Sequence, residues 1–240
     1  MEWQDEGIIL HTQPLGERKQ IISLFTLAHG RSAGVFSPTK KSKGWIQCGS
    51  KVKARWWARL DSHIGYWNLE SLGSNMAYLL DTAGPLGALV SAATLCHMAL
   101  PERQRYPHLY EQFHTLLQNF ISPHWMTSYI FFELTLLKEM GYGLDLETCA
   151  VTGVQSDLVA VSPRTGRSVC KDIAKRYEGR LLPLPSFIYE GNKEIPQNNE
   201  EILDALRLSG YFLERYVLGR TLPAARMRLL QQFTAIRKSA

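Results

Sequence analysis

Residues 51–60, KVKARWWARL, alternate two kinds of side chain, and this pattern indicates how the first part of the chain folds. Successive side chains of a β-strand point to opposite faces, so every second residue shares a face. One face would carry Lys51, Lys53, Arg55, Trp57 and Arg59, and the other Val52, Ala54, Trp56, Ala58 and Leu60. The alternation therefore predicts a strand with an apolar face in a core and a basic face toward solvent.

Four neighbouring stretches have the same character. They are short, rich in β-branched or aromatic residues and separated by Pro or Gly turns, at residues 7–15, 21–29, 32–37 and 66–72. A closed barrel leaves no strand edge unpaired. We therefore expect a small five-stranded barrel.

Beyond residue 75 the apolar residues recur at helical spacing. Helices are predicted over 87–99, 107–119, 123–140, 198–210 (or on to 218) and 223–237. Short strands at 157–161 and 167–170 flank the turn sequence SPRTG, and the Pro-rich residues 181–196 are expected to be irregular. The predicted fold is α+β: a barrel domain over 1–75 and a helical domain over 76–240, with a β-ribbon inserted at about 145–175.

The composition is that of an ordinary globular protein. The 240 residues are 45% hydrophobic, and 27 Lys+Arg against 22 Asp+Glu give a net charge of +5. Residues 82–101 lack charge, but Gly84, Pro85 and several weakly apolar alanines favour a buried helix over a membrane span. The acidic start MEWQDE does not resemble a secretory leader, and four scattered cysteines make no disulfide scaffold. A cytoplasmic protein with no membrane contact is expected.

Positive charge is concentrated in residues 31–60, which hold eight basic side chains and no acid. Tryptophans and Tyr66 are interleaved with them. Cations that follow phosphates, beside rings that stack on bases, suit single-stranded nucleic acid. The alternative is a solvated basic face over core tryptophans; Trp56 is expected in the core and Trp57 at the surface. The predicted DNA-binding residues are Arg31, Lys40, Lys41, Lys43, Lys51, Lys53, Arg55, Trp57 and Arg59.

Motifs of enzymatic chemistry are absent from the sequence. It holds no phosphate-binding loop, no dinucleotide-binding glycine pattern, no Gly-x-Ser-x-Gly and no His-Glu-x-x-His. Its seven histidines do not pair with carboxylates at metal-ligand spacing. We therefore expect no catalytic residues and no cofactor. A metal-dependent hydrolase is the competing hypothesis, and it predicts stoichiometric metal.

An ordered set of short motifs resembles the RecO family of bacterial recombination mediators, and it runs over most of the chain. The motifs are EGIIL at 6–10, GE at 16–17, IISLFTLAHG at 21–30, Gly34, KGWIQ at 43–47, FEL at 132–134, GYGLDL at 141–146, CAVTG at 149–153, SPRTGR at 162–167 and LLPLP at 181–185. None of them is diagnostic alone.

The resemblance implies an N-terminal OB-fold barrel followed by a helical domain. It also implies a non-enzymatic protein that binds single- and double-stranded DNA and anneals complementary strands. Such proteins act with RecR on DNA coated by single-strand-binding protein, and they help to load the RecA recombinase. The resemblance also implies that the helical domain receives the acidic tail of single-strand-binding protein. An adaptor whose barrel binds a protein or an RNA is the alternative function.

The sequence departs from the family in two places. Cys48 stands where many members have proline.

Some relatives hold zinc with two CxxC knuckles in the ribbon, but here Thr152 and Ile173 stand where the second thiols would be. Structural zinc needs four ligands, so Cys149 and Cys170 alone predict no bound metal. We expect the ribbon to be held by packing of Leu158, Val159, Val161 and Val169 instead.

A second basic cluster surrounds the ribbon turn, with Asp172 and Glu178 close by in the sequence. It consists of Arg164, Arg167, Lys171, Lys175 and Arg176. An ordinary charged surface and a secondary contact with DNA or a partner protein are both consistent with it.

Overall fold

The computed structural model describes residues 1–60, 63–73, 79, 82–177, 179–189, 195–196 and 198–239. The chain forms two compact units, Met1–Leu117 and Gln118–Ala240. The predicted domain boundary at residue 75 falls among residues 74–78, which lie outside the described part.

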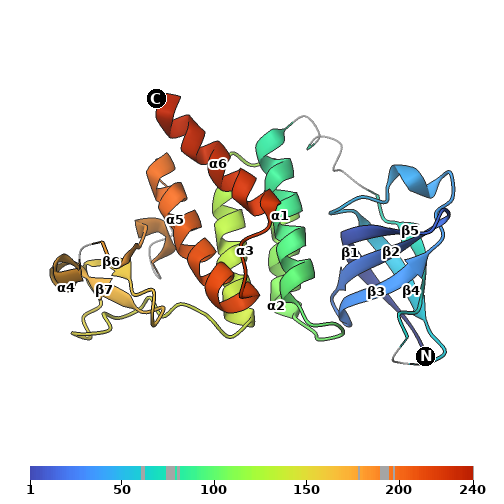
Figure 1. The fold of residues 1–240 in the computed structure, drawn as a ribbon, viewed down its shortest axis with the longest axis horizontal. Coiled ribbons are helices and arrows are strands. Elements are labelled where there is room, and N and C mark those ends of the chain that lie inside the picture. Colours follow the sequence, from blue (N-terminus) through green and yellow to red (C-terminus); the bar gives the residue numbers. More distant parts are fainter. Residues whose placement is uncertain are drawn as a thin grey trace. The chain divides into compact units, whose positions relative to one another are not determined.

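The first unit contains a closed barrel of five strands in the order β1-β2-β3-β5-β4 (Figure 1). The strands are β1 (Glu2–Leu15), β2 (Lys19–Thr26), β3 (Gly30–Phe36), β4 (Lys51–Trp57) and β5 (Tyr66–Ser71). The long strand β1 pairs with β4 through its first half and with β2 through its second half. A parallel pairing of Val35 with Tyr66 joins β3 to β5 and completes the ring. This architecture confirms the predicted OB-like barrel.

Two tryptophans occupy the barrel core. Trp56 is 2% exposed, and its indole N–H lies 3.0 Å from the Ala33 carbonyl oxygen. Trp67 is also buried and donates to the Ile22 carbonyl at 3.0 Å. Gly65 has φ +71° and lies so close to the Trp56 ring that an added Cβ would come within 2.4 Å of it. The core tryptophans are therefore anchored by hydrogen bonds as well as by packing.

The predicted alternation of β4 is confirmed as far as Trp57. Val52, Ala54 and Trp56 are buried, whereas Trp57 is 40% exposed. The prediction is wrong for Leu60, which is 59% exposed. The pairings of β4 with β1 and with β5 both end at Trp57, so the following residues leave the sheet and its two-residue alternation.

Two helices complete the first unit, α1 (Ala83–Ala99) and α2 (Pro107–Asn119), the latter extending two residues beyond it. α1 packs against β1 and buries apolar residues that include Ala88, Leu89 and Leu95. Among the described residues, no helix combines the length and the apolar character that a membrane span requires.

The second unit contains three main helices, α3 (Trp125–Glu139), α5 (Asn199–Phe212) and α6 (Ala224–Ser239), and α5 packs against the other two. Asn198 caps α5, since its side-chain oxygen accepts from the Glu201 N–H at 3.0 Å. α5 continues as a π-helical segment, Leu213–Leu218, which ends at Gly219 with φ +60°. The longer predicted extent of this helix, to residue 218, is the one observed.

A small sheet forms the inserted ribbon, with α4 (Lys171–Ala174) beside it (Figure 1). Its strands are β6 (Leu158–Val161), β7 (Ser168–Cys170) and β8 (Leu182–Pro183), in the order β7-β6-β8. The expectation that residues 181–196 are wholly irregular is wrong at β8, because Leu182 and Pro183 pair with β6. Short 3₁₀ turns occupy Ser42–Gly44, Lys175–Tyr177 and Ser186–Ile188.

The ribbon packs around its two cysteines. Cys149, Val169, Cys170 and Ile173 form one buried cluster, against which Leu158 packs. Val161 is buried elsewhere, but Val159 is 40% exposed, so its predicted place in the packing is wrong. The register of β6 with β7 shifts between Leu158 and Ala160, so Val159 lies at an irregularity of the strand.

Candidate nucleic-acid interface

A groove of about 790 Å³ lies on the barrel between the outer face of β4 and β5 and the segment that follows β3. Pockets of this size accommodate sizeable organic ligands. Its lining combines aromatic, basic and acidic residues, and β3 and β5 both contribute to it. The lining residues that could contact a ligand through charged, polar or aromatic groups are Glu2, Lys41, Trp45, Arg55, Trp57, Tyr66, Asn68 and Glu70.

Aromatic rings form one part of this groove. Trp57 and Tyr66 face each other across β4 and β5, with ring centroids 5.8 Å apart and planes inclined by 24°. They are 40% and 49% exposed, so both present ring surface to solvent. Trp45 is half-buried against Phe36 and also lines the groove. Such rings can stack on nucleic-acid bases.

Tyr66 and Trp45 are functional candidates that the sequence-based site prediction leaves out. The sequence shows both as aromatics near the basic stretch. Only the pairing of β4 with β5 shows that Tyr66 lies directly opposite Trp57. Trp45 reaches the groove because the chain turns at Ser42–Gly44 before returning to β4.

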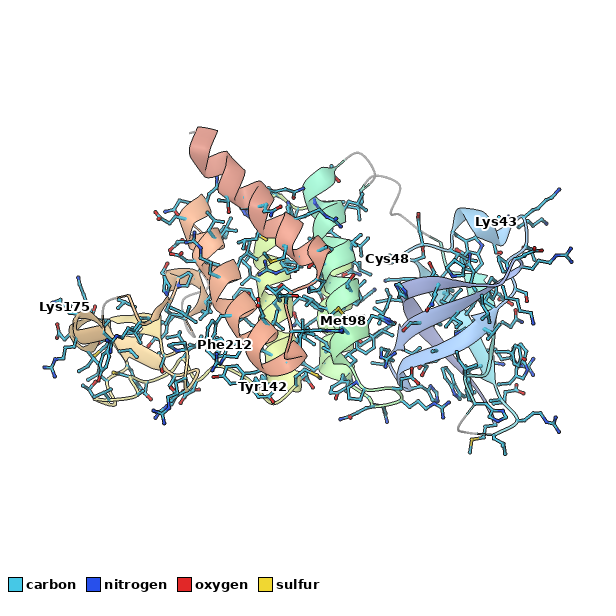
Figure 2. The ribbon with its side chains drawn as sticks, in the orientation of Figure 1. Lys43, Cys48, Met98, Tyr142, Lys175 and Phe212 are labelled. Carbon is cyan, nitrogen blue, oxygen red and sulfur yellow. The ribbon has the colours of Figure 1, made fainter. Side chains whose placement is uncertain are left out.

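Lysines of the turn supply the exposed cations of this region. Lys40, Lys41 and Lys43 are exposed, and Lys41 lines the groove (Figure 2 labels Lys43). Buried Ser42 fixes the turn, since its Oγ accepts from the Thr39 N–H at 2.8 Å and donates to the Thr39 carbonyl at 3.1 Å. The structure therefore keeps three predicted cations together on one ordered turn.

The cations of β4 have acidic neighbours that come from other strands. The guanidinium Nε of Arg55 lies 2.6 Å from Oε1 of Glu2. This hydrogen bond and charge lower the pKa of Glu2 and raise the pKa of Arg55. Lys53 pairs in register with Glu6 of β1 and with Glu70 of β5. The expectation of a strip without compensating acids is therefore wrong for β4.

The remaining predicted cations are separated from the groove. Lys51 is half-buried, and its ammonium contacts the His114 ring of α2; burial lowers the pKa of Lys51. Arg31 donates to the Leu100 carbonyl at 2.7 Å and pairs with Glu102 at 3.2 Å. Arg59 is exposed beyond the end of β4. Of the nine predicted residues, Lys41, Arg55 and Trp57 line the groove, and Lys40 and Lys43 lie on the turn beside Lys41. The other four lie outside the groove lining. The role of all nine in DNA binding remains a prediction.

Comparison with known proteins identifies the family. A family model described as "Recombination protein O N terminal" matches residues 1–73, and "Recombination protein O C terminal" matches residues 85–224. The chain belongs to the RecO family. RecO proteins are DNA repair proteins, and the predicted resemblance is confirmed.

Three relatives named "DNA repair protein RecO" illustrate the similarity. The relative from Cereibacter sphaeroides is 40% identical over 238 residues, which cover 96% of this chain and 98% of that protein. The one from Rhodospirillum rubrum is 39% identical over 243 residues, or 97% and 96% of the two chains. The one from Caulobacter vibrioides is 36% identical over 238 residues, or 97% of each. The likeness therefore spans barrel, helices and ribbon.

The second basic cluster of this RecO-family chain is partly paired. Nε of Arg167 lies 3.0 Å from Oδ2 of Asp145, and Nζ of Lys175 lies 3.4 Å from Oδ1 of Asp172. All four of these side chains are exposed. Lys171 and Arg176 are exposed on and after α4, and Figure 2 labels Lys175 in this region. Glu178 lies outside the described residues. Arg164 belongs to the turn between β6 and β7, so it comes from the other end of the ribbon.

The two ribbon cysteines lie in contact. The Cys170 N–H donates to Sγ of Cys149 at 3.4 Å, and Thr152 Oγ1 lies 3.7 Å from Sγ of Cys170. Burial raises the pKa of Cys149, but hydrogen bonds from the Thr152 side chain and from backbone N–H groups outweigh it and lower the pKa to about 6. Within the described ranges, no cluster of three or more His, Cys, Asp or Glu side chains has the arrangement of a metal site.

Proposed function

We propose that this protein is a non-catalytic DNA-repair mediator that binds single-stranded DNA in the barrel groove. The observation that carries the proposal is the exposed Trp57–Tyr66 pair beside the lysine turn, in a groove of about 790 Å³. Membership of a DNA repair family supports it independently. Neither feature requires a catalytic residue.

The groove suggests how one strand is held. Bases stack on Trp57 and Tyr66, which accept any base because every base has a π-face. Phosphates lie near the exposed turn lysines Lys40, Lys41 and Lys43. Neutralised phosphates repel a second strand less, so complementary strands approach and anneal.

We propose partners from the same functional class. They are RecR, the acidic tail of single-strand-binding protein and, indirectly, RecA, together with double-stranded DNA. The support for these partners is membership of the RecO family. This role would place the protein in the cytoplasm, near the nucleoid.

The ribbon offers a second contact for DNA or a partner. Lys171, Lys175 and Arg176 are exposed around α4, and Tyr177, beside them, is 47% exposed. A Lys171→Ala/Arg176→Ala double variant should weaken duplex binding and leave single-strand binding in the groove unchanged. Equal duplex affinity in the variant would remove this contact from the proposal.

Stacking in the groove is tested by fluorescence anisotropy with labelled oligothymidylate at fixed salt. Trp57→Ala and Tyr66→Ala should each lose about 1–3 kcal/mol, or roughly 5- to 150-fold in affinity, because each removes a stacking surface. Tyr142→Ala is the matched control, since Tyr142 is similarly exposed but lies in the other unit.

Full affinity in both groove variants would reject the groove as the DNA site. Tight binding of a labelled RNA of the same length, with weak binding of DNA, would instead favour the adaptor function. Each result changes the assignment, so the experiment decides between the two.

A further inference from the structure

The outer face of the barrel carries a regular pattern of charge in three cross-strand rows. Strand register places Glu2, Trp57 and Tyr66 in the first row, Gln4, Arg55 and Asn68 in the next, and Glu6, Lys53 and Glu70 in the third. All nine of these side chains are exposed. These nine side chains therefore include two cations and three carboxylates, which sum to −1.

Two of these carboxylates line the groove itself. Glu2 lies in the first row, beside Trp57, and forms an ion pair with Arg55. Glu70 lies two residues after Asn68 on β5. Lys41, on the turn, is the groove cation that belongs to another segment of the chain. Among the residues that line the groove, the turn thus contributes one cation, whereas the sheet side contributes two carboxylates and the cation Arg55.

This polarity matters for the strands that the groove accepts. An unpaired strand can place its phosphates at the turn and its bases on the rings. A duplex has no free base face for the rings, because its bases already stack on one another. It also brings a second phosphate backbone, which would face the carboxylates of the sheet, and like charges in proximity oppose binding.

We propose that Glu2 and Glu70 make the groove selective for unpaired DNA by repelling the second phosphate backbone of a duplex. This inference rests on the proposed function, since it assigns a substrate class to the same groove. Duplex DNA that the protein binds must then be held on another surface.

The test compares two probes on the full-length protein at one salt concentration, a labelled oligothymidylate and a blunt duplex of 20 base pairs. Glu70→Gln keeps the size of the side chain and removes its charge. It should raise duplex affinity about tenfold and single-strand affinity by no more than about threefold. Glu2→Gln also frees Arg55, so it should raise affinity for both probes, and for the duplex more.

Glu17→Gln is the matched control, because Glu17 is exposed on the turn after β1 and does not line the groove. A ratio of duplex to single-strand affinity that stays at the wild-type value in Glu70→Gln and Glu2→Gln would overturn the inference. Such a result would show that the carboxylates contribute only to net charge.

Failure of the proposed function has a different signature. If Trp57→Ala and Tyr66→Ala bind oligothymidylate as tightly as the unmodified protein, the groove is not the single-strand site. In that case the selectivity of the groove is also rejected. If those variants lose affinity and the glutamate variants leave the ratio unchanged, only the selectivity fails.

Discussion

The guanidinium of Arg226, on α6, and the carboxylate of Glu133, on α3, form an ion pair from which solvent is excluded. Nε and Oε1 lie 2.5 Å apart, Nη2 and Oε2 lie 3.0 Å apart, and both residues are 0% exposed. Tyr129 and Ser209 donate further hydrogen bonds to the same carboxylate at 2.6 and 2.5 Å. Because Ser209 belongs to α5, this one carboxylate connects all three main helices of the second unit.

Removal of one partner from this pair should destabilise the second unit strongly. Arg226→Ala would leave the Glu133 carboxylate buried without its counter-charge, at a cost of about 3–5 kcal/mol. Urea unfolding followed by circular dichroism measures the loss. Arg228→Ala, an exposed change on the same helix, is the control and should change stability by less than about 0.5 kcal/mol. Equal stability of the two variants would contradict the role assigned to the pair.

Lysines of the turn should determine part of the salt dependence of DNA binding. Lys41→Ala removes one exposed cation from the groove, so the slope of log K against log salt should decrease in magnitude by about 0.7 for single-stranded DNA. Arg31→Ala is the contrasting variant, because Arg31 is engaged with Leu100 and Glu102. We expect its slope to match that of the unmodified protein. The opposite order of the two slopes would remove Lys41 from the site.

The first unit should lose stability in acid through His97, on α1. This side chain stacks on His11 of β1, with ring centroids 4.6 Å apart. Burial, together with the nearby charges of His11 and Arg31, lowers the pKa of His97 from 6.5 to about 4. The unfolded chain therefore binds the proton more readily, and the stabilisation is full above about pH 6.5 and is lost as the pH falls toward 4.

Thermal unfolding between pH 7 and 4 tests this linkage. His97→Phe should flatten the dependence of the melting temperature on pH over this range, because the titrating ring is gone. His63→Phe, which changes an exposed ring, should retain the dependence of the unmodified protein. A curve for His97→Phe that matches the unmodified protein would refute the assignment.

The ribbon should accept zinc once two thiols are added. Thr152 Oγ1 lies 3.7 Å from Sγ of Cys170, close to the edge of about 3.8 Å in a tetrahedron with Zn–S bonds of about 2.3 Å. Ile173 packs in the same cluster as both cysteines. Thr152→Cys/Ile173→Cys should therefore bind about one zinc per chain, as measured by elemental analysis of protein purified under reducing conditions.

A third change provides the control for this site. Addition of Cys149→Ser to the double variant should abolish stoichiometric zinc, because one of the four ligands is lost. The absence of zinc from the double variant itself would show that the four positions do not converge as their contacts indicate.

The candidate site was partly predictable from sequence. The period-two pattern of residues 51–57 correctly separates buried Trp56 from exposed Trp57, because strand geometry fixes that alternation whatever the partner strands are. The pattern also continues to Leu60, where the structure leaves the sheet. Sequence alone does not show where β4 loses its partners, so it overextends the strand.

The order of barrel, helices and ribbon, the family and the concentration of cations near aromatic residues could all be predicted from the residue pattern. These properties follow from local periodicity and composition, which depend on near neighbours along the chain. The contacts of Glu2 with Arg55, of Tyr66 with Trp57 and of Arg226 with Glu133 exist only in the folded chain. Such contacts join residues far apart in the chain, and strand register and helix packing bring them together. The charge that a ligand meets on the barrel is therefore a property of the folded surface and cannot be read from residues 31–60 alone.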